Sequence, residues 1–225
     1  MALARFESFI YEENYPPQSE HIIDVTGITD EMLHTHGRSR KAVAEDFERL
    51  YAQADIICAH KLDFDKSFAK QMCDVAGIGL VKKEELCTLT NFDWPKKYTC
   101  HKLGHLAWEL GIDVKAADLH RAKNDVDLLA RVLSCYNFDK VLEYSRRPWI
   151  YLKAEIVGEW EDGGTQKAAA QSLGFSWQKI RGVDSLNFPK KWVKRTKSQA
   201  DVDHAIELGK SCANPFRVSI IQGIN

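Results

Sequence analysis

Two aspartates occupy positions where the surrounding pattern predicts apolar side chains, at the start of two predicted helices. Asp125 opens the helix face formed by apolar residues at steps of three and four within residues 119–133. Asp65 stands in the same way at the start of a predicted helix over residues 65–77. A carboxylate on a buried face loses its hydration unless it caps the helix, is paired or binds a metal. These aspartates are therefore the first candidates for chemistry.

His120 lies five residues before Asp125 and adds a group that can accept a proton. Carboxylates that converge at one end of a core, beside a histidine, are what a divalent-cation site requires. Each aspartate alone is also explained as a helix cap or a first-turn acid, and His120 as an ordinary histidine at a helix N-terminus. The spacing is compatible with the metal site and with these structural interpretations.

The elements that must position these residues alternate between strands and helices, which favours an α/β layer fold. Thr29 is a predicted N-cap, and Gly77 is a predicted helix stop. The predicted strands cover residues 5–11 and 54–60. TGITDEML indicates a short helix after Thr29, and longer predicted helices cover residues 40–53, 65–77, 101–112 and 119–133.

Composition and charge narrow the class of protein. The 225 residues carry a net charge of -1, and no stretch is long and apolar enough to cross a bilayer. Acidic residues near the start interrupt any signal peptide, so we expect a cytoplasmic protein without a membrane partner. The six cysteines form no Cys-x-x-Cys pair, which indicates reduced thiols rather than a disulfide framework.

A change in charge divides the chain near residues 145–149. Residues 1–148 carry 20 basic and 24 acidic side chains, a sum of -4, whereas residues 149–225 carry 11 and 8, a sum of +3. We therefore predict a first domain over residues 1–148 and a small, basic α+β module over residues 149–225.

Several motifs of the first domain resemble those of the DEDDh 3'-5' exonucleases. His60, Phe64 and Asp65 match the second motif of that family, with Lys61 in place of the usual asparagine. His120, Ala122 and Asp125 match the third motif. RFESFI, VTGITDEML and KLGHLAWELGI resemble further segments of the family in the same order, so the resemblance covers residues 4–136.

The resemblance implies a ribonuclease-H-like α/β fold and a 3'-5' exonuclease that acts on the 3' end of single-stranded DNA or RNA. In that chemistry two Mg²⁺ or Mn²⁺ ions, about 4 Å apart, hold the attacking water and the departing 3' oxygen. By resemblance Asp65 and Asp125 bind the metal ions, and His120 is the general base. The rival hypothesis is a noncatalytic nucleic-acid-binding or adaptor protein with the same fold.

The first motif of the family, an Asp-x-Glu pair on its first strand, has no counterpart in the expected place. Asp46 and Glu48 form such a pair, but within a predicted helix, and we reject them as a substitute. We therefore expect an N-terminally truncated domain with a reduced sheet, in which the two remaining aspartates bind metal weakly. Three explanations of the missing motif remain: a second chain completes the sheet, the active form is longer, or the protein is a noncatalytic relative.

A basic and aromatic segment marks the second module. Lysines, an arginine and a tryptophan within FPKKWVKRTK suit single-stranded nucleic acid, because they meet backbone charge and base stacking together. A strand with the tryptophan in the core and the lysines exposed explains the same pattern. The candidate nucleic-acid-binding residues are Lys190, Lys191, Trp192, Lys194 and Arg195.

Overall fold

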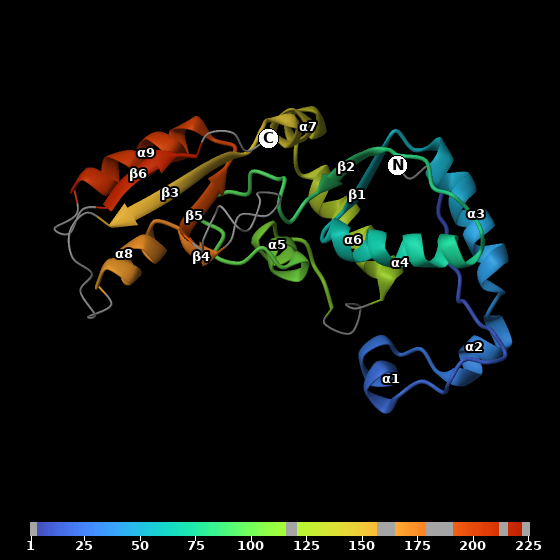
Figure 1. Cartoon of the computed structure of the whole chain (residues 1–225). Coiled ribbons are helices and arrows are strands. Elements are labelled where there is room, and N and C mark those ends of the chain that lie inside the picture. Colours follow the sequence, from blue (N-terminus) through green and yellow to red (C-terminus); the bar gives the residue numbers. More distant parts are fainter. Residues whose placement is uncertain (1–3, 116–120, 157–164, 179–190, 212–215, 222–225) are drawn as a thin grey trace. The chain divides into compact units, whose positions relative to one another are not determined.

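The structure is a computed structural model that describes residues 4–115, 121–156, 165–178, 191–211 and 216–221. The chain divides into two compact units, Met1–Ser145 and Arg146–Asn225 (Figure 1). Within the described ranges, no helix has the length and apolar character needed to span a membrane.

The first unit is mainly helical and contains one short sheet. Its helices, within the described residues, are α1 (Glu20–Thr26), α2 (Asp30–His36), α3 (Arg40–Gln53), α4 (Leu62–Val75), α5 (Leu103–Glu109), α6 (Ala122–Ser134) and α7 (Phe138–Arg146). Strands β1 (Ile56–Ala59) and β2 (Glu84–Cys87) pair in parallel, so that Ile56 lies opposite Glu84 and Ala59 opposite Cys87.

The predicted helices are confirmed, with shifted ends except for α3, which has the predicted bounds. Thr29 caps α2 as predicted, because its side chain accepts a hydrogen bond from the backbone N–H of Met32 at 3.2 Å. Gly77 follows α4 with a φ of +73°, the left-handed conformation that glycine adopts without strain. Helix α1 was not predicted, and Ser19 caps it in the same way as Thr29 caps α2.

The predicted strand over residues 5–11 is wrong. In this segment only Ile10 forms a β-bridge, in parallel with Arg38. The backbone N–H of Arg38 donates to the carbonyl oxygen of Phe9, and that of Tyr11 donates to the carbonyl oxygen of Arg38, each at 3.0 Å. An alternating pattern needs a partner strand along its whole length, and the described residues provide one only at this point.

The face of α4 that packs inward differs from the predicted one. We expected Phe68 and its neighbours to be buried behind Asp65, but Phe64 and Phe68 are 53% and 57% exposed. Leu62 and Cys73 are buried instead, and the helix begins at Leu62, three residues before the predicted start. Asp65 therefore opens an exposed apolar stripe rather than a core-facing one.

Helix α6 packs as predicted. Leu128, Leu129 and Val132 are buried, and they follow Asp125 at helical spacing. Leu128 and Val132 join a core cluster with residues of β2, α5, α7 and the segment between β2 and α5. The other buried members of this cluster are Leu86, Phe92, Trp94, Tyr98, Leu106, Ala107, Val141 and Leu142.

The second unit is an antiparallel sheet with helices. Its elements are β3 (Ile150–Ile156), α8 (Thr165–Ser172), β4 (Ser176–Gln178), β5 (Lys191–Thr196), α9 (Gln199–Ser211) and β6 (Phe216–Ile220). The sheet order is β4-β5-β3-β6, and every neighbouring pair is antiparallel. This βαββαβ order is the ferredoxin-like arrangement (Figure 1). Both helices contribute residues to one core.

Candidate active site

Helix α6 holds Asp125 in its first turn. The residue is half-buried, and its backbone N–H donates to the carbonyl oxygen of Arg121 at 2.9 Å. Because the three apolar residues of the same face are buried, the rotation of α6 about its axis is fixed by the core. The core thereby holds Asp125 at one defined position on the edge of the unit.

Helix α4 presents Asp65 from its first turn, directly after β1. The backbone N–H of Asp65 donates to the carbonyl oxygen of Lys61 at 3.3 Å, so the carboxylate lies beside the positive end of the helix. The residue as a whole is exposed. It is thus available to a ligand from solvent.

The two carboxylates are close enough to interact. Partial burial of the carboxyl group is the main cause that raises the pKa of Asp65, and repulsion by Asp125 raises it further. A backbone hydrogen bond, together with His60 and Lys61, opposes this rise. Two helices far apart in sequence therefore bring like charges together, as a cation-binding site does.

His60 connects β1 to two other segments rather than facing a ligand. Its Nε2–H donates to the carbonyl oxygen of His101 at 2.7 Å, because a carbonyl can only accept. Its Nδ1 forms a hydrogen bond with the hydroxyl of Thr88 at 3.0 Å. Thr88 is fully buried, and its hydroxyl also donates to the carbonyl oxygen of Ala59 at 3.4 Å. Burial lowers the pKa of His60, which agrees with a neutral ring in this arrangement. His60 positions the start of α4, and sequence reasoning did not foresee its partners.

Arg121 anchors the N-terminal end of α6. Its Nε donates to the carbonyl oxygen of Thr26 at 3.0 Å and its Nη2 to that of Gly27 at 3.2 Å. These carbonyls end α1 and would otherwise depend on water. Gly27 has a φ of +64°, and a Cβ there would lie 3.2 Å from the guanidinium nitrogen. The left-handed backbone therefore favours a glycine at this position, and a side chain there would also have to displace the guanidinium group by a few tenths of an ångström.

Ion pairs hold the N-terminal segment along α6, on both sides of Asp125 in sequence. Arg5 pairs with Asp127 at 3.1 Å, and Glu7 pairs with Lys123 at 3.2 Å. Residues two apart in an extended chain, such as Arg5 and Glu7, are about as far from each other as residues one turn apart in a helix. The spacing of the N-terminal segment therefore matches that of Lys123 and Asp127 on α6. The start of RFESFI, one of the segments that resemble the exonucleases, thus lies beside the helix that carries Asp125.

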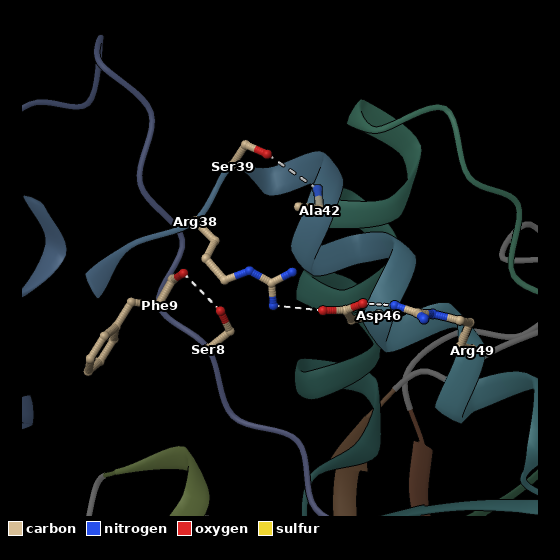
Figure 2. A network of polar contacts seen from close by, with 7 residues as sticks. All are labelled: Ser8, Phe9, Arg38, Ser39, Ala42, Asp46 and Arg49. Atoms are coloured by element: carbon tan, nitrogen blue, oxygen red, sulfur yellow. Dashed lines mark hydrogen bonds and ion pairs between the residues drawn. The ribbon is translucent and has the colours of Figure 1, made fainter. Parts of the chain in front are cut away.

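The rejection of Asp46 and Glu48 as a substitute pair agrees with the contacts of Asp46. Its carboxylate is bound by Arg38 at 2.6 Å and also by Arg49, so two guanidinium groups already neutralise it (Figure 2). The same figure shows Ser39 capping α3, where its hydroxyl accepts from the backbone N–H of Ala42 at 3.4 Å. Asp46 therefore connects Arg38 to α3.

The residues described by the structure contain no group of three or more histidine, cysteine, aspartate or glutamate side chains placed to hold a metal ion. Asp65 and Asp125 are nevertheless hard oxygen donors, and magnesium is often held by only one or two carboxylates together with substrate phosphates. The pair fits such an ion in donor type and charge. His120, the predicted general base, lies outside the described residues.

The candidate binding residues of the second unit fall on different faces of the sheet. Trp192 is 7% exposed and belongs to the core, so its ring does not face a base. Lys194 is half-buried and pairs in register with the buried Leu152, whereas Arg195 is exposed on the opposite face. Lys191 is the first residue of β5, and Lys190 lies outside the described residues.

Comparison with known proteins gives a family for the first unit. A search of curated proteins finds no match to the chain. The model of the exonuclease family of RNase T type matches residues 2–133, which is more than half of the 225 residues. This family has a ribonuclease-H-like α/β fold, and the mixture of helices and parallel strands in the first unit is consistent with it. The matched range contains Asp65 and Asp125, and the chain belongs to the exonuclease family.

Proposed function

We propose that this protein removes nucleotides from the 3' end of single-stranded DNA or RNA by metal-assisted hydrolysis of the phosphodiester bond. One feature carries the proposal: Asp65 and Asp125 stand in the first turns of two separate helices within the matched range, and the charge of Asp125 adds to the burial that raises the pKa of Asp65. Paired carboxylates of this kind are the usual ligands of a divalent ion in phosphoryl chemistry. Family membership supports nuclease activity in general.

Asp65 and Asp125 would hold Mg²⁺ or Mn²⁺, and the positive charge would relieve their mutual repulsion. The bound ion supplies Lewis acidity toward a phosphoryl oxygen and lowers the pKa of water. His60 keeps the start of α4 in place, and Arg121 does the same for α6. His120 is proposed as the general base from its match to the family motif.

We also propose that a strand from a second chain completes the sheet of the first unit. Among the described residues, β1 pairs only with β2, and sheets of two short strands have little stability of their own. Two carboxylates are few for a two-metal site, so we expect weak metal binding by a single chain. Hydrolysis per chain should then rise with protein concentration, and a constant rate per chain would remove this part of the proposal.

The decisive experiment is digestion of a 3'-labelled single-stranded oligonucleotide with Mn²⁺. We expect the unmodified chain to release the labelled terminal mononucleotide and Asp125→Asn to release none. The matched control is Asp127→Asn, because this carboxylate lies two residues further along the same helix and pairs with Arg5. Equal activity of Asp125→Asn and the unmodified chain would overturn the proposal.

A noncatalytic nucleic-acid-binding protein is the second candidate. The observation that favours it is the lack of a third metal-binding side chain near the two aspartates within the described ranges. It predicts that the chain retains labelled single strands without shortening them at any Mn²⁺ concentration. It also predicts that Asp125→Asn does not weaken this retention.

A further inference from the structure

Strand alternation separates the basic residues of the second unit into two groups. The core between sheet and helices contains Leu152 and Ala154 of β3 together with Trp192 of β5, and these residues lie on one face. The intervening residues must lie on the other face. That second face carries Tyr151, Lys153, Glu155, Arg195, Arg217 and Ser219. It also carries Val193, which is 2% exposed, so the face is covered at that point and exposed at Arg195 and Arg217.

The register of the sheet places aromatic and cationic side chains of this second face next to each other. Tyr151 lies opposite Arg195 on the neighbouring strand. The guanidinium carbon of Arg195 lies 4.5 Å from the ring centre of Trp149, which directly precedes β3. The ammonium group of Lys197 lies 4.8 Å from the same ring centre. Two cations thus share one indole ring, with a phenol beside them.

The charge of this group, which we call the Trp149 cluster (Trp149, Tyr151, Arg195 and Lys197), is positive. Lys197 is only 6% exposed, and its burial together with the nearby Arg195 lowers its pKa. Arg195 is exposed, and so is Arg217 of β6. Among the sheet residues named above, the acidic one is Glu155, and its carboxylate is bonded to Lys153 at 2.7 Å. An anionic ligand would lower the repulsion within the cluster.

We propose that the Trp149 cluster is a second contact for single-stranded nucleic acid, on the sheet face opposite the helices. Exposed arginine can bind phosphate, and a half-buried phenol and indole offer edges and faces for a base. The proposal differs from the sequence-based one because it assigns binding to Arg195 and excludes Trp192 and Lys194. It concerns binding alone and does not depend on hydrolysis at the two aspartates.

The sheet itself supplies matched control variants. Lys194 is the neighbour of Arg195 on the same strand but lies on the helix-covered face. Trp177 is 55% exposed, lies opposite Trp192 and so shares that same covered side. Arg195→Gln is therefore compared with Lys194→Gln, and Tyr151→Ala with both Tyr151→Phe and Trp177→Ala.

The measurement is fluorescence anisotropy of a labelled short oligothymidylate with the full chain, in EDTA, so that no hydrolysis occurs. We expect Arg195→Gln to weaken binding by about threefold to tenfold and to reduce the steepness of its salt dependence by about 0.7. Tyr151→Ala should weaken binding by about fivefold, whereas Tyr151→Phe, Trp177→Ala and Lys194→Gln should stay within about twofold of the unmodified chain. Thermal unfolding by circular dichroism confirms that each variant is folded.

Two results would overturn the proposal. Equal weakening by Arg195→Gln and Lys194→Gln would show that only net charge matters, and no weakening by Arg195→Gln would show that this face is not used. Asp125→Asn separates this proposal from that of metal-assisted hydrolysis, because it should abolish hydrolysis and leave the anisotropy titration in EDTA unchanged.

Discussion

Helices α4 and α6 each carry one of the two interacting aspartates, yet they are held in different ways. In α6 the apolar residues after Asp125 are buried, so the core fixes the helix. In α4 the aromatic residues on either side of Asp65, Phe64 and Phe68, are more than half exposed. This helix is held by Leu62, Cys73 and the hydrogen bonds of His60 before it. The same sequence signal, an acid before an apolar stripe, therefore describes two different packing situations.

The largest contrast should appear when one apolar residue of each helix is removed. Leu128→Ala should lower the free energy of unfolding by about 2–5 kcal/mol, because Leu128 is 4% exposed and leaves a cavity. Phe68→Ala should change it by less than about 0.5 kcal/mol, because the ring is mostly in water. Urea denaturation measures both values. A similar loss for Phe68→Ala would mean that another surface covers α4 in solution.

Metal affinity compares the two carboxylates directly. Asp65→Asn and Asp125→Asn should each weaken Mn²⁺ binding by about a hundredfold, since each removes one of two charged ligands. Isothermal titration calorimetry provides the measurement, with Asp63→Asn and Asp127→Asn as controls on the same two helices. If only Asp125→Asn weakens binding, the exposed helix α4 does not contribute a ligand.

His60 tests how the start of α4 is held. His60→Ala leaves the buried hydroxyl of Thr88 and the carbonyl of His101 without this partner, and should cost about 1–3 kcal/mol of folding stability. Thr88→Val removes only one of the two bonds and should cost less. Equilibrium unfolding in urea gives both values. A neutral His60→Ala would mean that α4 is positioned without this ring.

The smallest effect concerns pH. The fold raises the pKa of Asp65, so the folded chain binds this proton more tightly than the unfolded chain does. The extra folding stability that comes from this tighter proton binding is fully present below the ordinary pKa of aspartate. It is lost as the pH rises through the raised pKa of Asp65 in the folded chain. Solvent screening limits this loss to less than about 1 kcal/mol. In Asp125→Asn the pKa of Asp65 should fall in an NMR titration, and an unchanged value would show that the carboxylates do not interact.

Local signals were enough to predict much of the fold. The apolar spacing of α3 gave its bounds, whereas its Ser39 cap became apparent only from the structure. Short apolar runs indicated the mixture of strands and helices in the second unit. These features depend on residues close together in sequence. Helix α1 was missed because it is short and none of its residues is buried, so no apolar stripe marks it.

Other features depend on contacts between distant residues, which one sequence does not reveal. The segment around Ile10 alternates like a strand but meets a partner only at Arg38 among the residues that the structure describes. The exposure of Phe64 and Phe68 depends on what lies beside α4 in space, and the bonds of His60 reach 28 and 41 residues along the chain. For the site, the sequence indicated the two aspartates, whereas Thr88 and Arg121 became apparent only from the geometry.

The contact of Arg121 with the end of α1 has a consequence for the order of folding. Its two hydrogen bonds join residues 95 and 94 positions apart, so they close a loop that spans most of the first unit. Contacts of such separation form late, because the entropy of loop closure is lost before they contribute. During synthesis, the start of α6 can dock only after α1 to α5 have left the ribosome. The aspartate that completes the pair therefore joins the site among the last steps of this unit's folding.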